Sequence, residues 1–443
     1  MKYLFLLFLT LFSGLSFAAD NLQALRILPI QDGGRVKPLD TFAKESLGLI
    51  YGKEKYEGRD AVEILLTWIL QPQAWEEKKF FEIRYQLLKK ALKLEETRNH
   101  FSISEILKSE RLSYVMQELQ SKRESKVKLD PYFQSLQRLE TQIGTYKGIV
   151  RGDLLKFIPA KAGAQGQKWI SLAELTADAE GAQLQSAFSE ITRLFILHLG
   201  EITGEKSTVD IKNEIKTAVQ VFMNLAKNNN PDVYPDEQIL SSEVHYSHFH
   251  PFQKAWIFYL LSVVSMILIW ILKKEFLYKA AWAFALIGIG FHIYGFALRI
   301  YLTGRAPVSN MYETVVWVAL GAVVFSMIIE AIYRWRFILL AGAIVGGFCL
   351  MLSDFAPVVL DPSLQPLVAV LNSNFWLTTH VLTITISYAA FFLSFVLGDI
   401  ALLFFVRGEA DDSPRIRALV LSIYRATQIG VALLAPGIIL GGI

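Results

Sequence analysis

The stretch Asn372-Ser-Asn-Phe-Trp-Leu-Thr-Thr-His380-Val opens onto an apolar run in which Asp399 is the one charged residue between Val381 and Phe405. A run of this length can cross a bilayer, because a spanning helix needs about 20 apolar residues. An ionisable group at a membrane boundary is costly and therefore indicates a function. His380 is a candidate for such a function, since a neutral imidazole in this place suits a metal centre such as haem iron.

Five further apolar segments predict that the second half of the chain crosses the membrane about six times in total. The expected spans are Gln253–Leu272, Lys279–Tyr301, Glu313–Tyr333, Phe337–Leu352, Leu377–Phe405 and Ala418–Ile443. The fold class that follows is all-α, with a helical membrane domain over residues 253–443. A polar, mainly helical domain over residues 20–252 precedes it.

The polar domain carries several local signals. The stretch from Leu28 to Phe42 contains two glycines and two prolines, which predicts a turn-rich start and no helix. Apolar residues recur at helical spacing from Ala61, and Ser102-Ile-Ser-Glu105 is a capping-box pattern ahead of another helical run. Helical patterns return between Ser171 and Lys227. No catalytic constellation stands out in this domain.

The first 19 residues predict a secretory signal peptide. Lys2 begins it, an apolar run from Tyr3 to Leu15 follows, and Ser16-Phe17-Ala18 fits a cleavage site. The alternative is an anchor that is not cleaved. In both cases the residues after about Asp20 are exported.

Basic residues predict the orientation of the spans. Eight of them lie in three connections that would share one side of the membrane: Lys273, Lys274, Lys279, Arg334, Arg336, Arg407, Arg415 and Arg417. Only one basic residue, Arg305, lies in the two loops on the other side, Leu302–Tyr312 and Ser353–Trp376. The positive-inside rule then places these two loops and the polar domain in the periplasm of a multi-pass inner-membrane protein.

Composition excludes several classes of function. The net charge of +3 is too near neutral to indicate a nucleic-acid partner. Cys349 is the one cysteine of the sequence, so the chain has no internal disulfide. It also has no CxxC or CxxCH motif, which excludes a dithiol oxidoreductase and a c-type cytochrome.

His292 is the second intramembrane histidine, in Gly288-Ile-Gly290-Phe-His292-Ile-Tyr-Gly295. The three glycines permit either close helix packing or room for a flat ligand. Arg299 lies on the same helical face, about 10 Å nearer the periplasm at ~1.5 Å per residue. A deep imidazole below a guanidinium suits a haem whose carboxylates are paired at the surface. The alternative is a buried histidine hydrogen-bonded to a helix, beside a snorkelling arginine.

Other polar residues lie near the membrane boundary. Arg305 could pair with a haem propionate, and Ser309 is placed to cap the helix that Tyr312 and Glu313 begin. The stretch from Asp354 to Leu371 is apolar but broken by prolines, so it is either a lid on the membrane surface or a packed connector. Three further histidines, His245, His248 and His250, precede the first span. A juxtamembrane linker explains them better than a metal site, because their spacing does not fit one helical face.

Several separated motifs resemble the cytochrome c assembly family. They are Gly304-Arg-Ala-Pro-Val-Ser-Asn-Met-Tyr-Glu313, Leu364 to Val381, Ile386-Ser-Tyr-Ala-Ala and Ile423-Tyr-Arg-Ala-Thr-Gln-Ile-Gly. They follow the order of the CcsA/ResC subgroup, the haem-handling subunit of the System II cytochrome c synthase. The segment Gly34-Arg-Val-Lys-Pro-Leu-Asp-Thr-Phe also resembles a periplasmic stretch of fused synthases.

The resemblance implies a site and partners. His380 corresponds to an external axial haem ligand, and His292 to a transmembrane histidine of long-chain members. The implied function is cytochrome c biogenesis: haem delivery across the inner membrane and its presentation to the CxxCH thiols of apocytochrome c, as part of a synthase (haem lyase) complex. The implied partners are a CcsB/ResB-type membrane protein, apocytochrome c, thiol-reducing periplasmic proteins and membrane lipid.

The resemblance stops short in one respect. The family continues into a tryptophan-rich haem-binding segment, which is not present before Ile443. We therefore expect a truncated chain that alone does not mature a c-type cytochrome. Two alternatives remain, a non-enzymatic membrane scaffold and a small-molecule transporter. Few charges within the spans argue against the transporter.

Overall fold

The computed structural model describes residues 22–126, 128–161, 168–175, 178–202, 210–356, 359–366 and 374–441. The predicted signal peptide, residues 1–19, lies outside this set. The chain divides into two compact units, Met1–Val244 and His245–Ile443. The division falls a few residues before the start of the first expected span.

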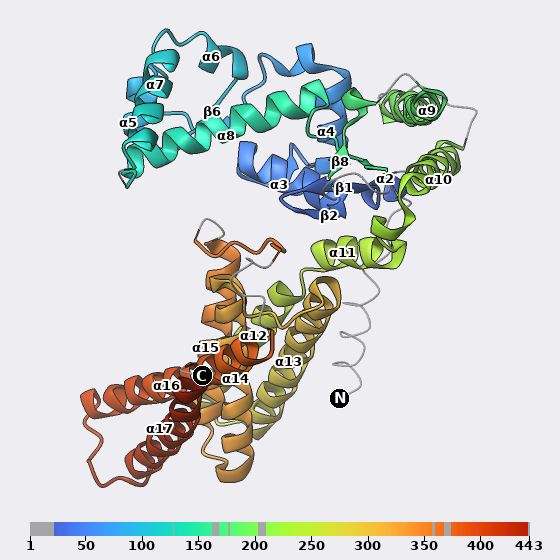
Figure 1. Cartoon of the computed structure of the whole chain (residues 1–443). Coiled ribbons are helices and arrows are strands. Elements are labelled where there is room, and N and C mark those ends of the chain that lie inside the picture. The colour runs from blue at the N-terminus through green and yellow to red at the C-terminus, as the bar shows by residue number, and fades with distance from the viewer. Residues whose placement is uncertain are drawn as a thin grey trace. The chain divides into compact units, whose positions relative to one another are not determined.

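The N-terminal unit is mainly helical, in agreement with the prediction (Figure 1). Its helices are α2 (Gln23–Arg26), α3 (Leu39–Tyr51), α4 (Ala61–Leu70), α5 (Gln86–Ala91), α6 (Ile103–Leu107), α7 (Leu112–Glu124), α8 (Pro131–Arg151), α9 (Ala179–Ile202) and α10 (Ile211–Asn229), with 3-10 turns η1 (Pro72–Trp75), η2 (Leu172–Glu174) and η3 (Pro231–Val233). Helix α11 (Glu237–Phe249) crosses the division between the units.

Four short antiparallel ladders accompany these helices. They pair β1 (Pro29–Asp32) with β2 (Arg35–Pro38), β3 (Lys55–Tyr56) with β4 (Arg59–Asp60), β5 (Phe81–Glu82) with β6 (His100–Phe101), and β7 (Ile158–Pro159) with β8 (Trp169–Ile170). Each ladder has only two strands. They connect loop segments between helices, and the fold class remains all-α.

The start of the unit is partly as predicted. Gly33 and Gly34 both have positive φ, 60° and 83°, and form the turn of the β1–β2 hairpin. The prediction of no helix before Phe42 was wrong, because α3 begins at Leu39. One face of α3 is apolar at helical spacing and is buried, which outweighs the turn signals that precede it.

Other local signals are confirmed. Asp60 caps α4, since its side chain accepts a hydrogen bond from the Val62 amide. Ser102 and Glu105 form the predicted capping box at α6. The helical patterns predicted between Ser171 and Lys227 correspond to α9 and α10, and α10 stops at Asn229.

An aromatic cluster forms the centre of the N-terminal unit. Trp68 lies 5.6 Å from Phe80 and 6.0 Å from Trp75, measured between ring centroids, and Phe80 lies 5.3 Å from Tyr146. These rings are among the most buried side chains of the unit. Large buried rings supply a core for a unit without a disulfide.

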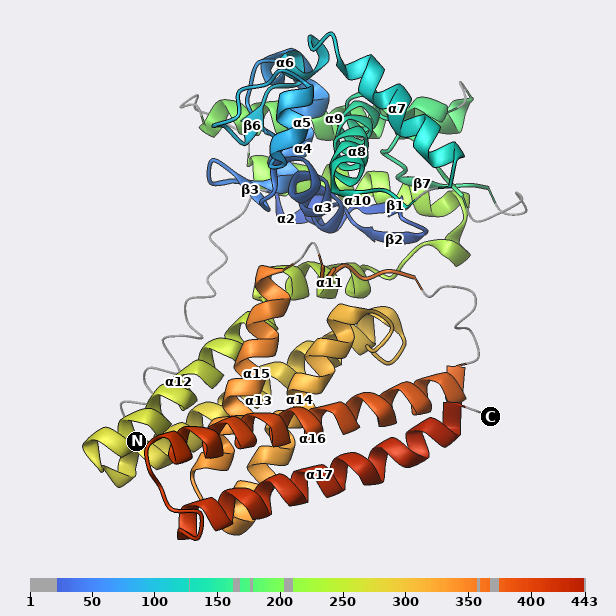
Figure 2. The ribbon, with the colours of Figure 1, turned by 90° about the vertical axis from the view of Figure 1, so that its left-hand side faces the viewer.

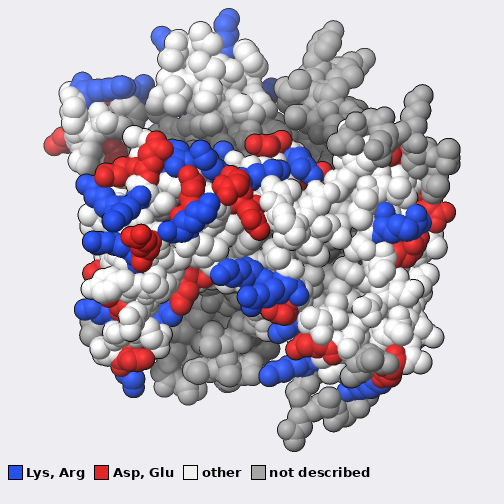
Figure 3. All heavy atoms as spheres, turned by 90° about the horizontal axis from the view of Figure 1, so that it is seen from above, with Lys and Arg blue, Asp and Glu red and all other residues white. Residues whose placement is uncertain are grey.

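The surface of the molecule carries charges of both signs. Figure 3 shows basic and acidic side chains interleaved on the face that it displays. Many are paired, as Arg123 is with Glu140 and Arg193 with Glu190. The charge on the displayed face is therefore mixed in sign.

Among its described residues, the membrane unit contains six helices long and apolar enough to span a bilayer, which confirms the predicted six spans. They are α12 (Pro251–Leu272), α13 (Glu275–Thr303), α14 (Met311–Tyr333), α15 (Phe337–Phe355), α16 (Asn374–Val406) and α17 (Pro414–Gly441). His250 separates α11 from α12 in a left-handed conformation, with φ of 47°, and Pro251 begins α12.

The spanning helices pack as hairpins. Helices α12 and α13 lie side by side, and so do α16 and α17 (Figures 1 and 2). Helix α15 packs against α12 and α14, while α16 packs against α14. Hydroxyl groups link neighbouring helices: Ser262 donates to the Ala281 carbonyl at 2.9 Å, and Ser394 and Thr427 hydroxyls lie 2.9 Å apart.

Glycines near His292 serve close helix packing in this structure. A Cβ atom at Gly288 would lie 2.7 Å from two ring carbons of Tyr259, and one at Gly295 would lie 2.8 Å from the Phe252 ring. Gly290 differs, because nothing lies within 4 Å of the corresponding point. Two of the three glycines therefore accommodate aromatic rings of α12.

We predict that Gly288→Ala destabilises the membrane unit by about 1–3 kcal/mol, because the added methyl group meets a rigid buried ring. The apparent melting temperature of the full chain in detergent micelles measures this loss. Gly290→Ala is the matched control and should leave the melting temperature unchanged or raised, since alanine favours the helix. Equal losses in both variants would contradict the packing role of Gly288.

Candidate functional site

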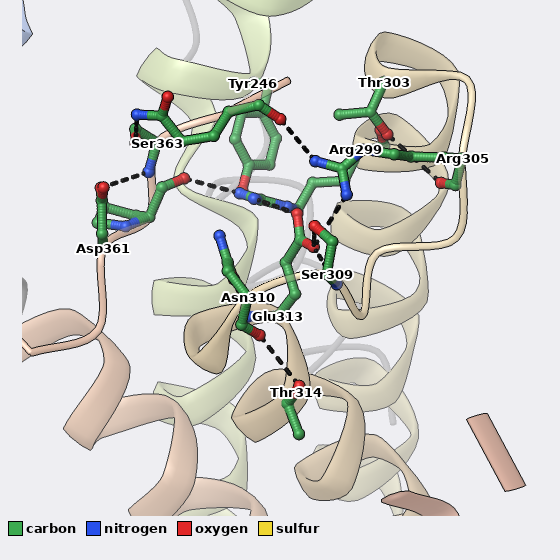
Figure 4. Close-up of polar contacts among 12 residues, drawn as sticks. Tyr246, Arg299, Thr303, Arg305, Ser309, Asn310, Glu313, Thr314, Asp361 and Ser363 are labelled. Carbon is green, nitrogen blue, oxygen red and sulfur yellow. Dashed lines mark hydrogen bonds and ion pairs between the residues drawn. The ribbon is translucent and has the colours of Figure 1, made fainter. Parts of the chain in front are cut away.

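A buried ion pair connects α13 and α14. Arg299 Nη2 donates to Glu313 Oε1 at 2.7 Å, and each side chain is only 1% exposed. Arg299 Nη1 donates to the Tyr246 hydroxyl at 3.1 Å and to the Pro362 carbonyl at 2.9 Å (Figure 4). One guanidinium thus binds α11, α14 and the segment after α15. A buried charge of this kind requires such compensation.

The second oxygen of Glu313 binds the α13–α14 loop. Ser309 donates to Glu313 Oε2 twice, from its amide at 2.9 Å and from its hydroxyl at 2.8 Å. The prediction that Ser309 caps α14 was wrong, because Asn310 is the cap and accepts from the Glu313 amide at 2.8 Å. The side-chain oxygen of Asn310 accepts from the backbone N–H of Glu313, which has no partner within the helix. Ser309 is therefore available to bind the Glu313 carboxylate.

Arg305 lies next to the same carboxylate. Its Nη1 is 3.9 Å from Glu313 Oε2, while its Nη2 donates to the Gln365 carbonyl at 2.7 Å. The structure therefore brings Arg299 and Arg305 together on Glu313. Within the described residues, Arg299 Nε and Arg305 Nη1 are buried and have no hydrogen-bond acceptor.

These contacts also decide how the apolar segment after α15 is held. Its described part, residues 359–366, supplies backbone carbonyls to both arginines. Leu360 and Leu364 are buried, and Asp354 at the end of α15 accepts from the Trp256 indole at 2.6 Å. This part is a packed connector, the second of the two alternatives.

His292 is fully buried, and both of its ring nitrogens have a hydrogen-bond partner. Nδ1 lies 3.1 Å from the Tyr259 hydroxyl and Nε2 lies 3.1 Å from the Val316 carbonyl. The carbonyl can only accept, so Nε2 carries the proton and Nδ1 accepts from Tyr259. The ring of Phe296 stacks on the imidazole at 5.6 Å. A metal ion would have to displace one of the two hydrogen bonds.

His380 presents a different arrangement. Its Nδ1 lies 2.7 Å from the carbonyl of Gly437 on α17. Because that carbonyl accepts, Nδ1 carries the proton and the lone pair is on Nε2. A Cβ atom at Gly441 would collide with the imidazole, so glycine is needed beside this ring. The two histidines are thus held by different helices, His292 by α12 and α14 and His380 by α17.

The three histidines before the first span lie in α11 and at its end. His245 Nε2 lies 2.9 Å from the Tyr294 hydroxyl, and His250 occupies the bend between α11 and α12. In the part of the chain that the structure describes, no three His, Cys, Asp or Glu side chains lie close enough to hold a metal ion.

Sequence reasoning missed two tyrosines and the partner of Arg299. Tyr246 and Tyr259 bind the Arg299 and His292 side chains from elements that precede α13. Glu313 could have been found, because a lone acid at the start of one span, 14 residues after a lone arginine at the end of the previous span, suggests an ion pair. No local signal marks either tyrosine.

The sequence matches one protein family. The Cytochrome C assembly protein family covers residues 308–443. This range includes Glu313 and His380, whereas His292, Arg299 and Arg305 precede it. The matched part thus contains four of the six apolar helices, α14 to α17.

Individual relatives extend the comparison. Protein NrfI of Wolinella succinogenes is 26% identical over 434 residues, which are 93% of this chain and 45% of that protein. The cytochrome c biogenesis protein CcsA of Synechocystis sp. is 36% identical over 112 residues, 25% of this chain and 32% of that protein. CcsA of Nostoc punctiforme is 33% identical over 109 residues. The chain spans less than half the length of these relatives.

We predict that Arg299→Gln destabilises the membrane unit by about 3–5 kcal/mol, because it leaves the Glu313 carboxylate buried without its counter-charge. A double-mutant cycle with Glu313→Gln, followed by denaturation in detergent, should give a coupling energy of about 1–3 kcal/mol.

The matched control is the exposed pair of Arg336 and Glu275, which has the same 2.7 Å separation but side chains 41% and 69% exposed. Its cycle should give at most about 1 kcal/mol. Equal coupling energies for the two pairs would contradict the organising role of the buried pair.

Proposed function

We propose that this chain is a cytochrome c assembly protein of the CcsA type that handles haem in cytochrome c biogenesis, and the match of residues 308–443 to that family supports the proposal. The CcsA relatives are cytochrome c biogenesis proteins by name. The proposed activity is delivery of haem across the inner membrane and its presentation to the CxxCH thiols of apocytochrome c.

The observation that carries the proposal is the hydrogen bond of His380. Donation from Nδ1 to the Gly437 carbonyl fixes the ring and leaves the Nε2 lone pair for a metal. Ligating histidines commonly hold their second nitrogen in this way. His380 is half-buried, so the imidazole is neither in the packed core nor fully in solvent.

His380 would hold haem iron through its Nε2 atom. Haem bound there would supply an iron centre that the imidazole protects, and vinyl groups that react with cysteine thiols. Arg305 is the proposed partner for a propionate, because its Nη1 has no hydrogen-bond acceptor among the described residues. We assign Arg299 a supporting role through its buried Nε, since its other nitrogens hold Glu313 and Pro362.

His292 is the second proposed ligand, and its geometry sets a condition. Nδ1 becomes available to a metal only when the Tyr259 hydroxyl turns away. Tyr259→Phe would remove that hydroxyl while retaining the ring that fills the space beside Gly288. If His292 is a ligand, Tyr259→Phe should increase haem binding, because Nδ1 becomes available. If His292 serves packing alone, the variant should leave haem binding unchanged.

The remaining parts of the proposal concern location and partners. The polar domain and the loops after α13 and α15 would lie in the periplasm, because the basic residues gather in the other three connections. A CcsB/ResB-type membrane protein, apocytochrome c and thiol-reducing periplasmic proteins are the proposed partners, within a synthase complex.

A second candidate function is a membrane scaffold that binds no haem. The complete hydrogen bonding of His292 and the pairing of Arg299 with Glu313 favour it, because both residues then serve stability. Haem content of the purified chain separates the two functions.

We expect the chain, purified in mild detergent after expression with ample haem, to show a Soret band. His380→Ala should lower the haem content about tenfold, because the axial imidazole is lost. Added imidazole should restore the band by occupying the vacated position. Absence of haem from the wild-type chain would favour the scaffold.

His245→Ala is the control for this test, since His245 is also a boundary histidine but binds Tyr294. It should leave the Soret band unchanged. Gly441→Ala keeps the His380 imidazole but presses on it, and should shift the band or weaken it. An unaltered band in both His380→Ala and Gly441→Ala would refute His380 as the ligand.

The orientation is tested with reporter fusions. An alkaline phosphatase fused after Gln365 should be active, because the positive-inside rule places that loop in the periplasm. The same reporter fused after Asp412 should be inactive, while a cytoplasmic fluorescent reporter there should fold. The opposite pattern would place His380 on the cytoplasmic side and refute the proposed orientation.

A further inference from the structure

A cavity of about 540 Å³ opens between α13 and α14, far along both helices from the Arg299–Glu313 pair. It lies where α13 begins and α14 ends. Its lining includes Tyr278, Lys279, Trp282, Leu286, Glu330 and Arg334. The cavity is open to the surroundings over much of its extent.

The two cations of this cavity, Lys279 and Arg334, form no ion pair within the described residues. Lys279 and Arg334 are both exposed, and neither has a carboxylate within ion-pairing distance in the described part of the chain. Arg336, two residues further on, differs because it pairs with Glu275 at 2.7 Å. Two unpaired cations on one cavity favour an anionic occupant.

The acid in the lining is already satisfied. Glu330 is fully buried and accepts from the Tyr278 hydroxyl at 2.5 Å, from the Arg336 amide at 2.7 Å and from the Leu339 amide at 3.4 Å. Its hydrogen bonds hold the end of α14 and the start of α15. The Glu330 carboxylate is therefore bound by Tyr278 and two backbone amides. The accessible charges of the cavity are those of Lys279 and Arg334.

The other side of the cavity is apolar. Trp282 and Leu286 follow Lys279 at one-turn intervals along α13, and Leu286 is 55% exposed on a helix that faces the membrane. A tryptophan between a cation and an exposed leucine is typical of the depth at which lipid headgroups meet acyl chains. The lining thus changes from cationic to aromatic to aliphatic along one helix.

We propose that this cavity binds the phosphate headgroup of an anionic phospholipid, with Lys279 and Arg334 on the phosphate and the acyl chain along Leu286. The order of charge, aromatic ring and apolar side chain matches the order of the parts of such a lipid. The positive-inside rule places the cavity in the cytoplasmic leaflet, where anionic lipids supply this chemistry. The proposal is independent of haem binding.

The test uses Trp282 as the probe. The full chain is reconstituted in phosphatidylcholine vesicles containing a minor fraction of brominated phosphatidylglycerol or, separately, of brominated phosphatidylcholine. The difference in fluorescence between the wild type and Trp282→Phe isolates this tryptophan. We expect brominated phosphatidylglycerol to quench it more strongly than brominated phosphatidylcholine at the same mole fraction.

Lys279→Gln/Arg334→Gln should lower the preference for phosphatidylglycerol at least about tenfold, since each cation near an anionic lipid contributes roughly fivefold. Lys279→Arg/Arg334→Lys should retain it. The matched control is Lys273→Gln/Lys274→Gln. It removes the same charge, and Lys273 ends α12 with the φ of 52° that Arg334 has at the end of α14. This control should also retain the preference.

An equal loss of the phosphatidylglycerol preference in Lys279→Gln/Arg334→Gln and in Lys273→Gln/Lys274→Gln would mean that general surface charge causes the preference. That result would overturn the proposal. Equal quenching by the two brominated lipids would overturn it as well. A change in Trp282 fluorescence on adding soluble glycerol phosphate, at constant ionic strength and without phosphatidylglycerol, would assign the cavity to free phosphate esters and exclude the lipid.

Discussion

The ion pair between Arg299 and Glu313 is the constraint on which the arrangement of the membrane unit depends. Each side chain is only 1% exposed, and neither charge is tolerable at that depth without the other. The pair fixes the end of α13 against the start of α14. Through Tyr246, Ser309 and the Pro362 carbonyl it also binds α11, the α13–α14 loop and the segment after α15.

The need to compensate these buried charges explains why the polar residues where α13 ends and α14 begins bind one another. Within the described residues, Arg305 and Arg299 together contact two backbone carbonyls and one carboxylate, and each keeps one buried nitrogen without an acceptor. A site organised in this way is largely preformed. An anionic group that binds there can use the remaining donors without disturbing the pair, which is the physical basis for proposing Arg305 as a carboxylate partner.

The two intramembrane histidines illustrate how hydrogen bonding decides chemistry for the same side chain. His292 has an acceptor for its proton and a donor for its lone pair, so the imidazole is saturated. His380 has an acceptor for its proton, the Gly437 carbonyl, and its lone pair is directed elsewhere. Only the second arrangement resembles that of a histidine ready to bind a metal. The residue type is the same, and the difference lies in what the neighbouring helices supply.

The sequence by itself determined the six spans, the capping box of α6 and the membrane boundary position of His380, because hydropathy, caps and periodicity are local properties. It also indicated the family through motifs that lie between α13 and α17. Local signals failed at α3, where a buried apolar face outweighs the preceding turn, and at Ser309, where the cap is the next residue. Only the tertiary structure decided that Glu313 pairs with Arg299. It also decided that the Tyr259 ring fills the space beside Gly288 while its hydroxyl binds His292 Nδ1. The same holds for the two cations, Lys279 and Arg334, that line one cavity. These outcomes depend on contacts between helices that are distant in sequence, and no pattern within a single helix specifies which side chain a neighbouring helix will present.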